Sequence, residues 1–197
     1  SYQTAWLKSH YPAQFMAAAL SSEMGDSDKI QLLLDDAKVL GLKILPPDIN
    51  LSTKDFVTLD NESILFSLGA IKGVGDPAIE NIIQERSKKP FENLNEFVSR
   101  VDLKKVDKRS LEPLIKSGAL DSFNEDRFEM INKLEGALKF AKQKTELKES
   151  NIDDLFGEIS NSIALKQTKL SSKFQEFGKS KLELDSLGFY LTAHPLD

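Results

Sequence analysis

Cysteine is absent from the 197 residues of this chain, and histidine occurs only twice, as His10 and His194 near opposite ends. The first absence excludes disulfides and thiolate metal sites, and the second leaves little material for a histidine-rich metal site. No apolar run is long enough to span a bilayer, and the first residues do not form a secretory signal. We therefore expect a cytoplasmic protein with no membrane partner.

Recognisable catalytic patterns are also lacking. The sequence contains no P-loop and no nucleophile with a base at a credible spacing. Pairs of adjacent acids such as Asp35-Asp36 and Asp153-Asp154 point to different sides of a helix and are most simply solvated. From the residues alone, we expect a binding segment that has no catalytic residues, no metal site and no cofactor.

Acidic residues outnumber basic ones, which gives a net charge of −5, but the charge is unevenly distributed. Residues 60–120 are neutral overall, and residues 100–109 carry five basic side chains against two acidic ones. The five are Arg100, Lys104, Lys105, Lys108 and Arg109. Such a cluster is compatible with a few phosphate contacts, and a solvated helix face or loop is the alternative.

The stretch Lys72-Gly73-Val74-Gly75 lies between an apolar segment and a run with helical spacing. Its glycines permit a positive φ and the close approach of another backbone. Asp76 can cap the following helix and Pro77 suits its first turn, so the turn and the helix N-terminus together predict a phosphate site. We interpret the stretch as a helix-hairpin-helix that holds a nucleic-acid backbone without reading sequence. A tight turn between packed helices is the alternative, and the Asp76 carboxylate would compete with phosphate.

A second, smaller hairpin is expected at Ser117-Gly118. Two hairpins in succession indicate a tandem, pseudo-symmetric pair, in which the second has one glycine and forms the weaker phosphate cradle. The helix before it contains Pro113, which a helix tolerates only in its first turn, and this favours Ser110 as the N-cap.

Helical spacing of apolar residues dominates the rest of the chain, so the predicted fold class is mainly α. Residues 56–59 and 63–66 predict a small β-hairpin, the only strands that we expect. The expected divisions are a helical segment (1–59), the β-hairpin with the tandem helix-hairpin-helix (60–123), a long helix (124–149), a flexible segment (150–178) and the start of a following region (179–197).

The apolar island Ile152-Asp153-Asp154-Leu155-Phe156 lies within the polar stretch from Ser150 to Ser172. An apolar island in a flexible polar chain is typical of a short peptide that docks into a partner's groove. A loop that folds back onto its own domain is the alternative.

Four stretches carry a family resemblance: SYQTAWLKSHYPAQFM at residues 1–16, LPPD at 45–48, FSLGAIKGVG at 66–75 with VDL at 101–103 and LIKSGA at 114–119, and LGFYLTAHP at 187–195. They resemble the alpha subunits of bacterial DNA polymerase III, the C-family replicative polymerases. The resemblance implies an interior piece of a DNA-directed DNA polymerase, which runs from the end of the fingers domain (1–59) through the tandem helix-hairpin-helix to the clamp-binding region. The family's three palm aspartates, which hold two Mg²⁺ ions, would lie before Ser1, so no acid of this chain inherits that role.

The same resemblance implies that the first hairpin holds the duplex backbone behind the polymerase active site. With the basic cluster and the second hairpin, the candidate DNA-binding residues are Lys72, Gly73, Val74, Gly75, Lys104, Lys105, Lys108, Arg109, Ser117 and Gly118. The island at Ile152–Phe156 takes the place of the family's clamp-binding peptide, with Leu155 and Phe156 in the apolar pocket of the clamp. Ile152 stands where the family usually has Gln, whose amide hydrogen bonds are lost. The implied partners are duplex DNA, the sliding clamp and the other replicase subunits.

Two other functions stay open from the residues. A stand-alone helix-hairpin-helix repair protein, such as a glycosylase, would need a catalytic Lys or Asp beyond the hairpin, and Lys88 and Asp102 are available. A protein-interaction scaffold without any DNA contact is the second alternative.

Overall fold

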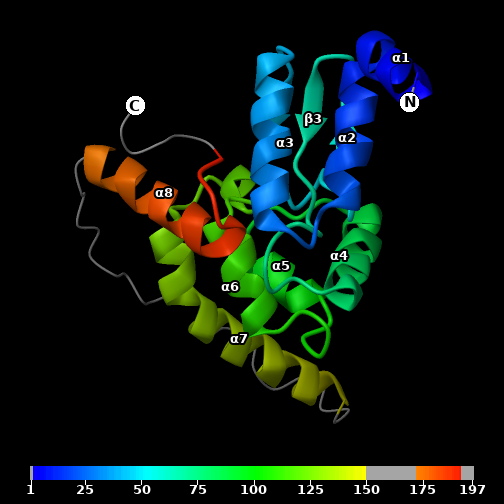
Figure 1. The fold of residues 1–197 in the computed structure, drawn as a ribbon. Coiled ribbons are helices and arrows are strands. Elements are labelled where there is room, and N and C mark those ends of the chain that lie inside the picture. Colours follow the sequence, from blue (N-terminus) through cyan, green and yellow to red (C-terminus); the bar gives the residue numbers. More distant parts are fainter. Residues whose placement is uncertain (1, 150–171, 192–197) are drawn as a thin grey trace.

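The structure is a computed structural model that describes residues 2–149 and 172–191. Within these residues the fold is mainly helical with one small sheet, as the sequence predicts (Figure 1). The N-terminal elements are α1 (Tyr2–His10), α2 (Pro12–Ser22), α3 (Ser27–Val39), β1 (Lys43–Leu45), β2 (Val57–Thr58) and β3 (Ser63–Leu65). The later elements are α4 (Asp76–Lys88), α5 (Leu94–Arg100), α6 (Lys108–Lys116), the 3₁₀ turn η1 (Asp121–Phe123), α7 (Arg127–Glu149) and α8 (Ser172–Leu187).

The helices α2 and α3 lie side by side and run along the small sheet (Figure 1). The chain turns between α1 and α2 because Pro12 occupies the first position of α2 and restricts the residue before it. The Asp26 carboxylate accepts hydrogen bonds from the first amides of α3. Gly41, which has a φ of 78°, follows the end of α3, a common place for glycine because it adopts the left-handed conformation without strain.

The sheet has the strand order β1-β3-β2. The predicted β-hairpin is confirmed, with Val57 opposite Leu65 in an antiparallel pair. The parallel strand β1 was not expected, because Pro46 and Pro47 end it after three residues and leave little β pattern to read. Since β1 pairs with β3, one sheet spans the expected division at residues 59 and 60.

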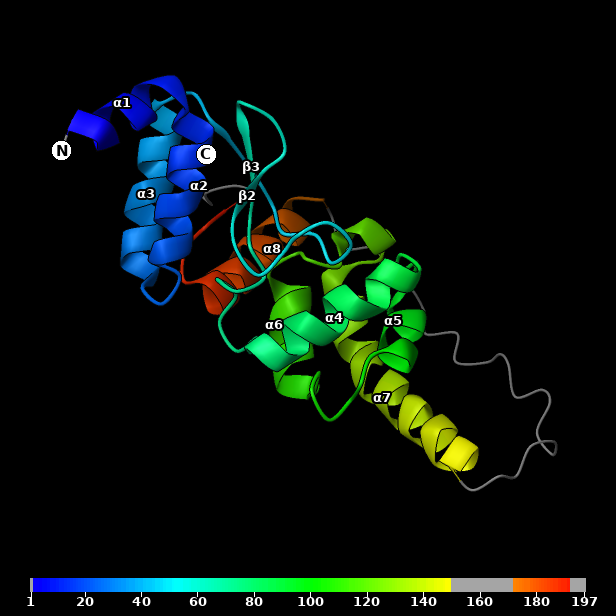
Figure 2. The same cartoon turned by 90° about the vertical axis from the view of Figure 1, so that its right-hand side faces the viewer.

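The helices α4 to α8 form the second part of the molecule. Within it, α8 lies between the helices α4 to α7 and the α2–α3 pair (Figure 2). A T-shaped contact between Phe91 and Phe97, with ring centroids 4.8 Å apart, lies in the shared core. The half-buried Arg86 of α4 donates to the carbonyl oxygens of Ile49 and Ser52, which fastens the loop after β1 to this part. The far end of α7 points away from the other elements (Figures 1 and 2).

Two local predictions need correction. The cap of α6 is Asp107, whose carboxylate accepts from the amide of Ser110, so Pro113 is the sixth residue of the helix and not in its first turn. Pro113 has no amide hydrogen to give to the carbonyl of Arg109, and this turn of α6 is therefore open to a neighbour. The helix α8 begins at Ser172, within the range expected to be flexible.

Candidate nucleic-acid interface

The turn Lys72–Gly75, called the first turn below, is anchored from beneath by apolar side chains. Ile71 and Val74 are buried, and the Val74 amide donates to the carbonyl of Ile71. Gly73 has a φ of 88°, and a Cβ atom there would lie 3.3 Å from both the Arg109 carbonyl oxygen and Pro113 Cγ. The first turn therefore fits against the part of α6 that Pro113 opens, and only glycine permits this approach.

Three backbone amides of the first turn and of the start of α4 have no acceptor in the described part of the chain. They belong to Gly73, Gly75 and Asp76, all of which are exposed. Gly75 is the N-cap of α4, but it has no side chain to accept from the helix. A Cβ atom at Gly75 would meet only Pro77 Cδ, at an ordinary 3.7 Å. Unpaired amides at an uncapped helix N-terminus form an arrangement suited to a phosphate oxygen.

The Asp76 carboxylate has a cationic partner that the sequence analysis missed. Lys54 Nζ lies 2.7 Å from Asp76 Oδ2, and both side chains are exposed. The hydrogen bond and the attraction to Asp76 raise the pKa of Lys54 above its ordinary value. The Gly69 amide donates to the Lys54 carbonyl and holds this loop beside the first turn. No local sequence pattern could reveal the pair, because Lys54 and Asp76 lie 22 residues apart and meet through the tertiary fold.

The predicted basic segment borders the first turn. One end is fixed to α4, where the Asp102 amide donates to Asn81 Oδ1, and the other end meets Gly73 through the Arg109 carbonyl. Lys104, Lys105 and Arg109 are exposed and have no acidic partner among the described residues. The other two members of the cluster are engaged: Lys108 Nζ lies 2.5 Å from Glu135 Oε1, and Arg100 stacks over Phe91 and donates to nearby carbonyls.

The second hairpin satisfies its own polar groups. The amides of Ser117, Gly118 and Ala119 all donate to α6 carbonyls, and the buried Ser117 hydroxyl donates to the Leu114 carbonyl. Gly118 resembles Gly73 in its φ of 86°, but a Cβ atom there would collide with the Arg127 guanidinium. The geometry therefore leaves Ser117 and Gly118 no donor for a phosphate, and we leave them out of the interface.

Arg127 fills the space beneath the second hairpin. It is 2% exposed, and its guanidinium donates to both carboxylate oxygens of Asp121, at 2.6 and 2.8 Å, and to Glu183 of α8 at 3.3 Å. Burial lowers the pKa of Arg127, but the hydrogen bonds and attraction of Asp121 and Glu183 outweigh it, so the pKa is raised. The second hairpin thus resembles the first turn in its glycine conformation, but Arg127 packs against Gly118 where α6 packs against Gly73.

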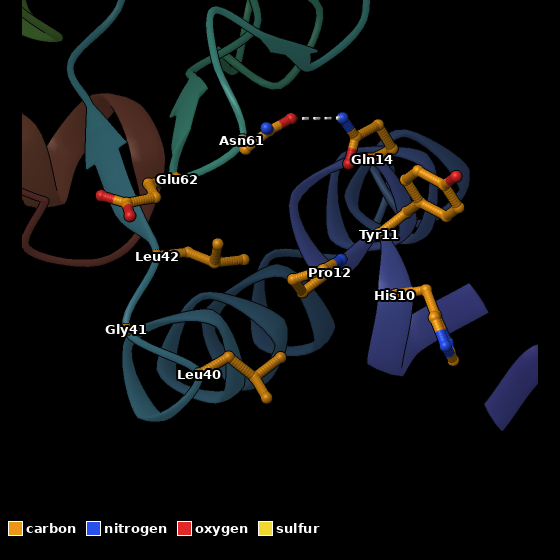
Figure 3. A pocket seen from close by; sticks show the side chains of 9 residues that line it. All are labelled: His10, Tyr11, Pro12, Gln14, Leu40, Gly41, Leu42, Asn61 and Glu62. Atoms are coloured by element: carbon orange, nitrogen blue, oxygen red, sulfur yellow. Dashed lines mark hydrogen bonds between the residues drawn. The ribbon is translucent and has the colours of Figure 1, made fainter. Parts of the chain in front are cut away.

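The other regions of interest lie elsewhere. The predicted clamp-binding residues Ile152, Asp153, Asp154, Leu155 and Phe156 fall outside the described residues. A cavity of about 450 Å³ lies where α1, α2, the end of α3 and the β2–β3 turn meet, and Gln14 and Asn61 bond across it (Figure 3). It contains none of the predicted site residues. Within residues 2–149 and 172–191, no group of three metal-ligating side chains is assembled, and no helix is long and apolar enough to cross a membrane.

Comparison with known proteins identifies the family. Residues 41–130, which contain both hairpins, match a family described as a helix-hairpin-helix motif. The whole chain is 41% identical to a segment of the DNA polymerase III subunit alpha of Escherichia coli (strain K12). The chain belongs to the DNA polymerase III alpha-subunit family. Alpha subunits from Vibrio cholerae and Thermus aquaticus are also 41% identical over the whole chain. The chain spans only 16–17% of the length of these alpha subunits.

Proposed function

We propose that this segment holds the backbone of duplex DNA, without reading its sequence, for a polymerase of the alpha-subunit family. The observation that carries the proposal is the set of exposed amides at Gly73, Gly75 and Asp76, which have no acceptor among the described residues. The match of the surrounding residues to a helix-hairpin-helix motif supports it. Backbone amides can contact phosphate oxygens of any sequence, which gives position and affinity but no base discrimination.

The cations beside these amides supply long-range attraction. Lys72, Lys104, Lys105 and Arg109 are exposed and have no acidic partner among the described residues, although the whole chain has a net charge of −5. A local basic surface on an acidic protein favours a small number of phosphate contacts over wrapping of the DNA. The affinity should therefore be modest and fall with salt.

The polymerase reaction belongs to the complete alpha subunit in this proposal. DNA-directed nucleotidyl transfer would use Mg²⁺ held by palm acids outside this chain, as the family resemblance implies, and this segment would supply no catalytic residue. Its contribution is to keep the duplex in place while chemistry proceeds elsewhere. We also propose the cytoplasmic location that the sequence analysis expects.

The two residues that a glycosylase-like function would need are both engaged in local contacts. Lys88 Nζ lies 2.6 Å from Glu85 Oε1, and the Asp102 carboxylate accepts from the Lys104 amide at 2.9 Å. Both contacts join residues of one helix or one loop, which is how surface side chains support local structure. We therefore favour the DNA-holding function over a repair enzyme.

Fluorescence anisotropy with a labelled 20-base-pair duplex tests DNA holding. The chain should bind two unrelated sequences with equal affinity, and Lys104→Gln with Lys105→Gln should weaken both equally. The variant should also reduce the slope of log K against log salt by about 1.8, because each lost phosphate contact removes about 0.9. An affinity that differs strongly between the sequences, or a slope that the variant does not change, would refute the proposal.

The second part of the proposal is that this segment tethers the polymerase to the sliding clamp. The other replicase subunits would bind to the complete alpha subunit. Clamp tethering is supported by the apolar island at residues 152–156 and its place in the family pattern. Replacing Leu155 and Phe156 with alanine should abolish binding to the clamp in a titration. Replacing Ile163 and Leu165, an apolar pair in the same stretch, is the matched control and should have no effect. Equal loss in both variants would contradict the assignment.

A further inference from the structure

The C-terminal end of α8 lies directly against the first turn, although the two are far apart in the sequence (Figure 2). The Lys72 amide donates to the Ser186 carbonyl at 3.1 Å. This bond joins the first turn to the last turn of α8. The first turn is therefore bounded on one side by α6 and on the other by α8.

Gly188 follows α8 and leaves the space that the Lys72 side chain occupies. Its φ is 91°, and a Cβ atom there would lie 2.6 Å from Lys72 Nζ and 3.4 Å from Lys72 Cε. The same atom would lie 3.4 Å from Ser27 Cβ at the start of α3. The end of the Lys72 side chain thus lies against the backbone of Gly188, directly after the C-terminus of α8. The carbonyl groups at the C-terminus of a helix favour a cation.

The helix α8 is itself held firmly in this position. Glu183 is fully buried, pairs with Arg127 beneath the second hairpin and accepts from the Leu191 amide at 3.1 Å. Phe189, directly after Gly188, is buried and packs against Phe66 near the sheet, with ring centroids 6.0 Å apart. Contacts on both sides of Gly188 therefore fix the surface on which Lys72 rests.

We propose that Gly188 is a positioning residue for DNA binding, which acts by placing the Lys72 ammonium at the edge of the first turn. The inference rests on the proposed DNA-holding function. It extends the interface to α8, a helix outside the residues that match the helix-hairpin-helix motif. In this arrangement the DNA affinity of the first turn depends on a residue that need not touch DNA.

A double-mutant cycle tests the inference. The wild-type chain, Gly188→Ala, Lys72→Ala and the double variant are titrated with duplex DNA over a range of salt concentrations. Each single variant should weaken binding about threefold or more at low salt and reduce the salt slope by about 0.9, the value of one phosphate contact. The double variant should match Lys72→Ala, because Gly188 acts through that side chain.

Gly41→Ala controls for backbone strain. Gly41 also has a positive φ, 78°, but a Cβ atom there would have no neighbour within 4 Å. Both glycine variants should lower the melting temperature, and only Gly188→Ala should change the salt slope. If Gly188→Ala weakens binding equally with and without Lys72, or leaves the slope unchanged, the inference is wrong.

The two proposals fail in different ways. If Gly75→Thr, which blocks the unpaired amides, leaves DNA binding intact, the DNA-holding function of the first turn fails. If Gly75→Thr abolishes binding and Gly188→Ala has no effect beyond that of Gly41→Ala, only the role of Gly188 fails.

Discussion

Replacing Asp76 with asparagine is expected to strengthen DNA binding, because the change removes a carboxylate beside the unpaired amides and releases Lys54. In the structure Lys54 Nζ lies 2.7 Å from this carboxylate, and no other described acid forms an ion pair with it. The wild-type interface has four exposed cations without an acidic partner among the described residues, so the slope of log K against log salt should be about −3.6. With Lys54 released, the slope should become about −4.5, and at 0.1 M salt one additional contact corresponds to up to about eightfold tighter binding.

The assay is anisotropy of a labelled duplex, measured from 50 to 300 mM salt. Asp35→Asn is the matched control, since it removes the same charge from an exposed pair on α3, in which Lys38 Nζ lies 3.6 Å from Asp35. The control should keep the wild-type slope, and Asp76→Asn should also lower the melting temperature slightly because a carboxylate at a helix N-terminus stabilises the helix. Equal gains from both variants would show an effect of net charge only, and an unchanged slope for Asp76→Asn would refute the role of Lys54.

Two further predictions separate structural cations from binding ones. Arg127→Leu should lower the free energy of unfolding by about 3–5 kcal/mol in urea titrations, because it breaks the buried ion pair between Arg127 and Glu183, and a loss below about 1 kcal/mol would contradict this. Arg100→Gln should cost about 1–2 kcal/mol of stability, since the guanidinium satisfies the carbonyls of Glu85 and Lys89. Its salt slope for DNA binding should stay at the wild-type value, and a reduced slope would place Arg100 in the interface.

Helical spacing of apolar residues predicted the mainly α fold class correctly, and some helix ends follow from single residues. Asp26 and Gly41 mark the ends of α3 because a cap and a positive φ are properties of single residues. The strand β1 was missed because its stability comes from pairing with β3, which lies about twenty residues farther along the chain. Pro113 was placed in a first turn because its cost in a helix is a local rule. In the structure the open carbonyl of Arg109 instead meets Gly73, a tertiary contact that the rule does not include.

The candidate site shows the same division. Gly73 and Gly118 have nearly equal φ values, and their local sequences indicate two related hairpins. They differ in their amides, because those of the second hairpin donate to α6 carbonyls, whereas those of Gly73 and Gly75 have no acceptor among the described residues. Lys54 and Gly188 approach the first turn from distant parts of the chain, so no motif contains them. The sequence could therefore predict the turn and its nearby cations. It could not predict the tertiary contacts that bring Lys54 and Gly188 to the first turn, or the hydrogen bonds that satisfy the amides of the second hairpin.

Contact between the DNA backbone and the amides of the first turn that have no acceptor among the described residues is best tested by Gly75→Thr. The substitution fits the free protein, because Gly75 has ordinary extended backbone and a Cβ atom there would make only an ordinary contact with Pro77 Cδ. Threonine is also about as favourable as glycine at a helix N-cap, so the melting temperature should hardly change. The added side chain would cover the amides, so we expect the folded variant to lose DNA binding at 0.1 M salt. A folded Gly75→Thr chain that binds duplex DNA as tightly as the wild type would show that these amides do not contact the DNA.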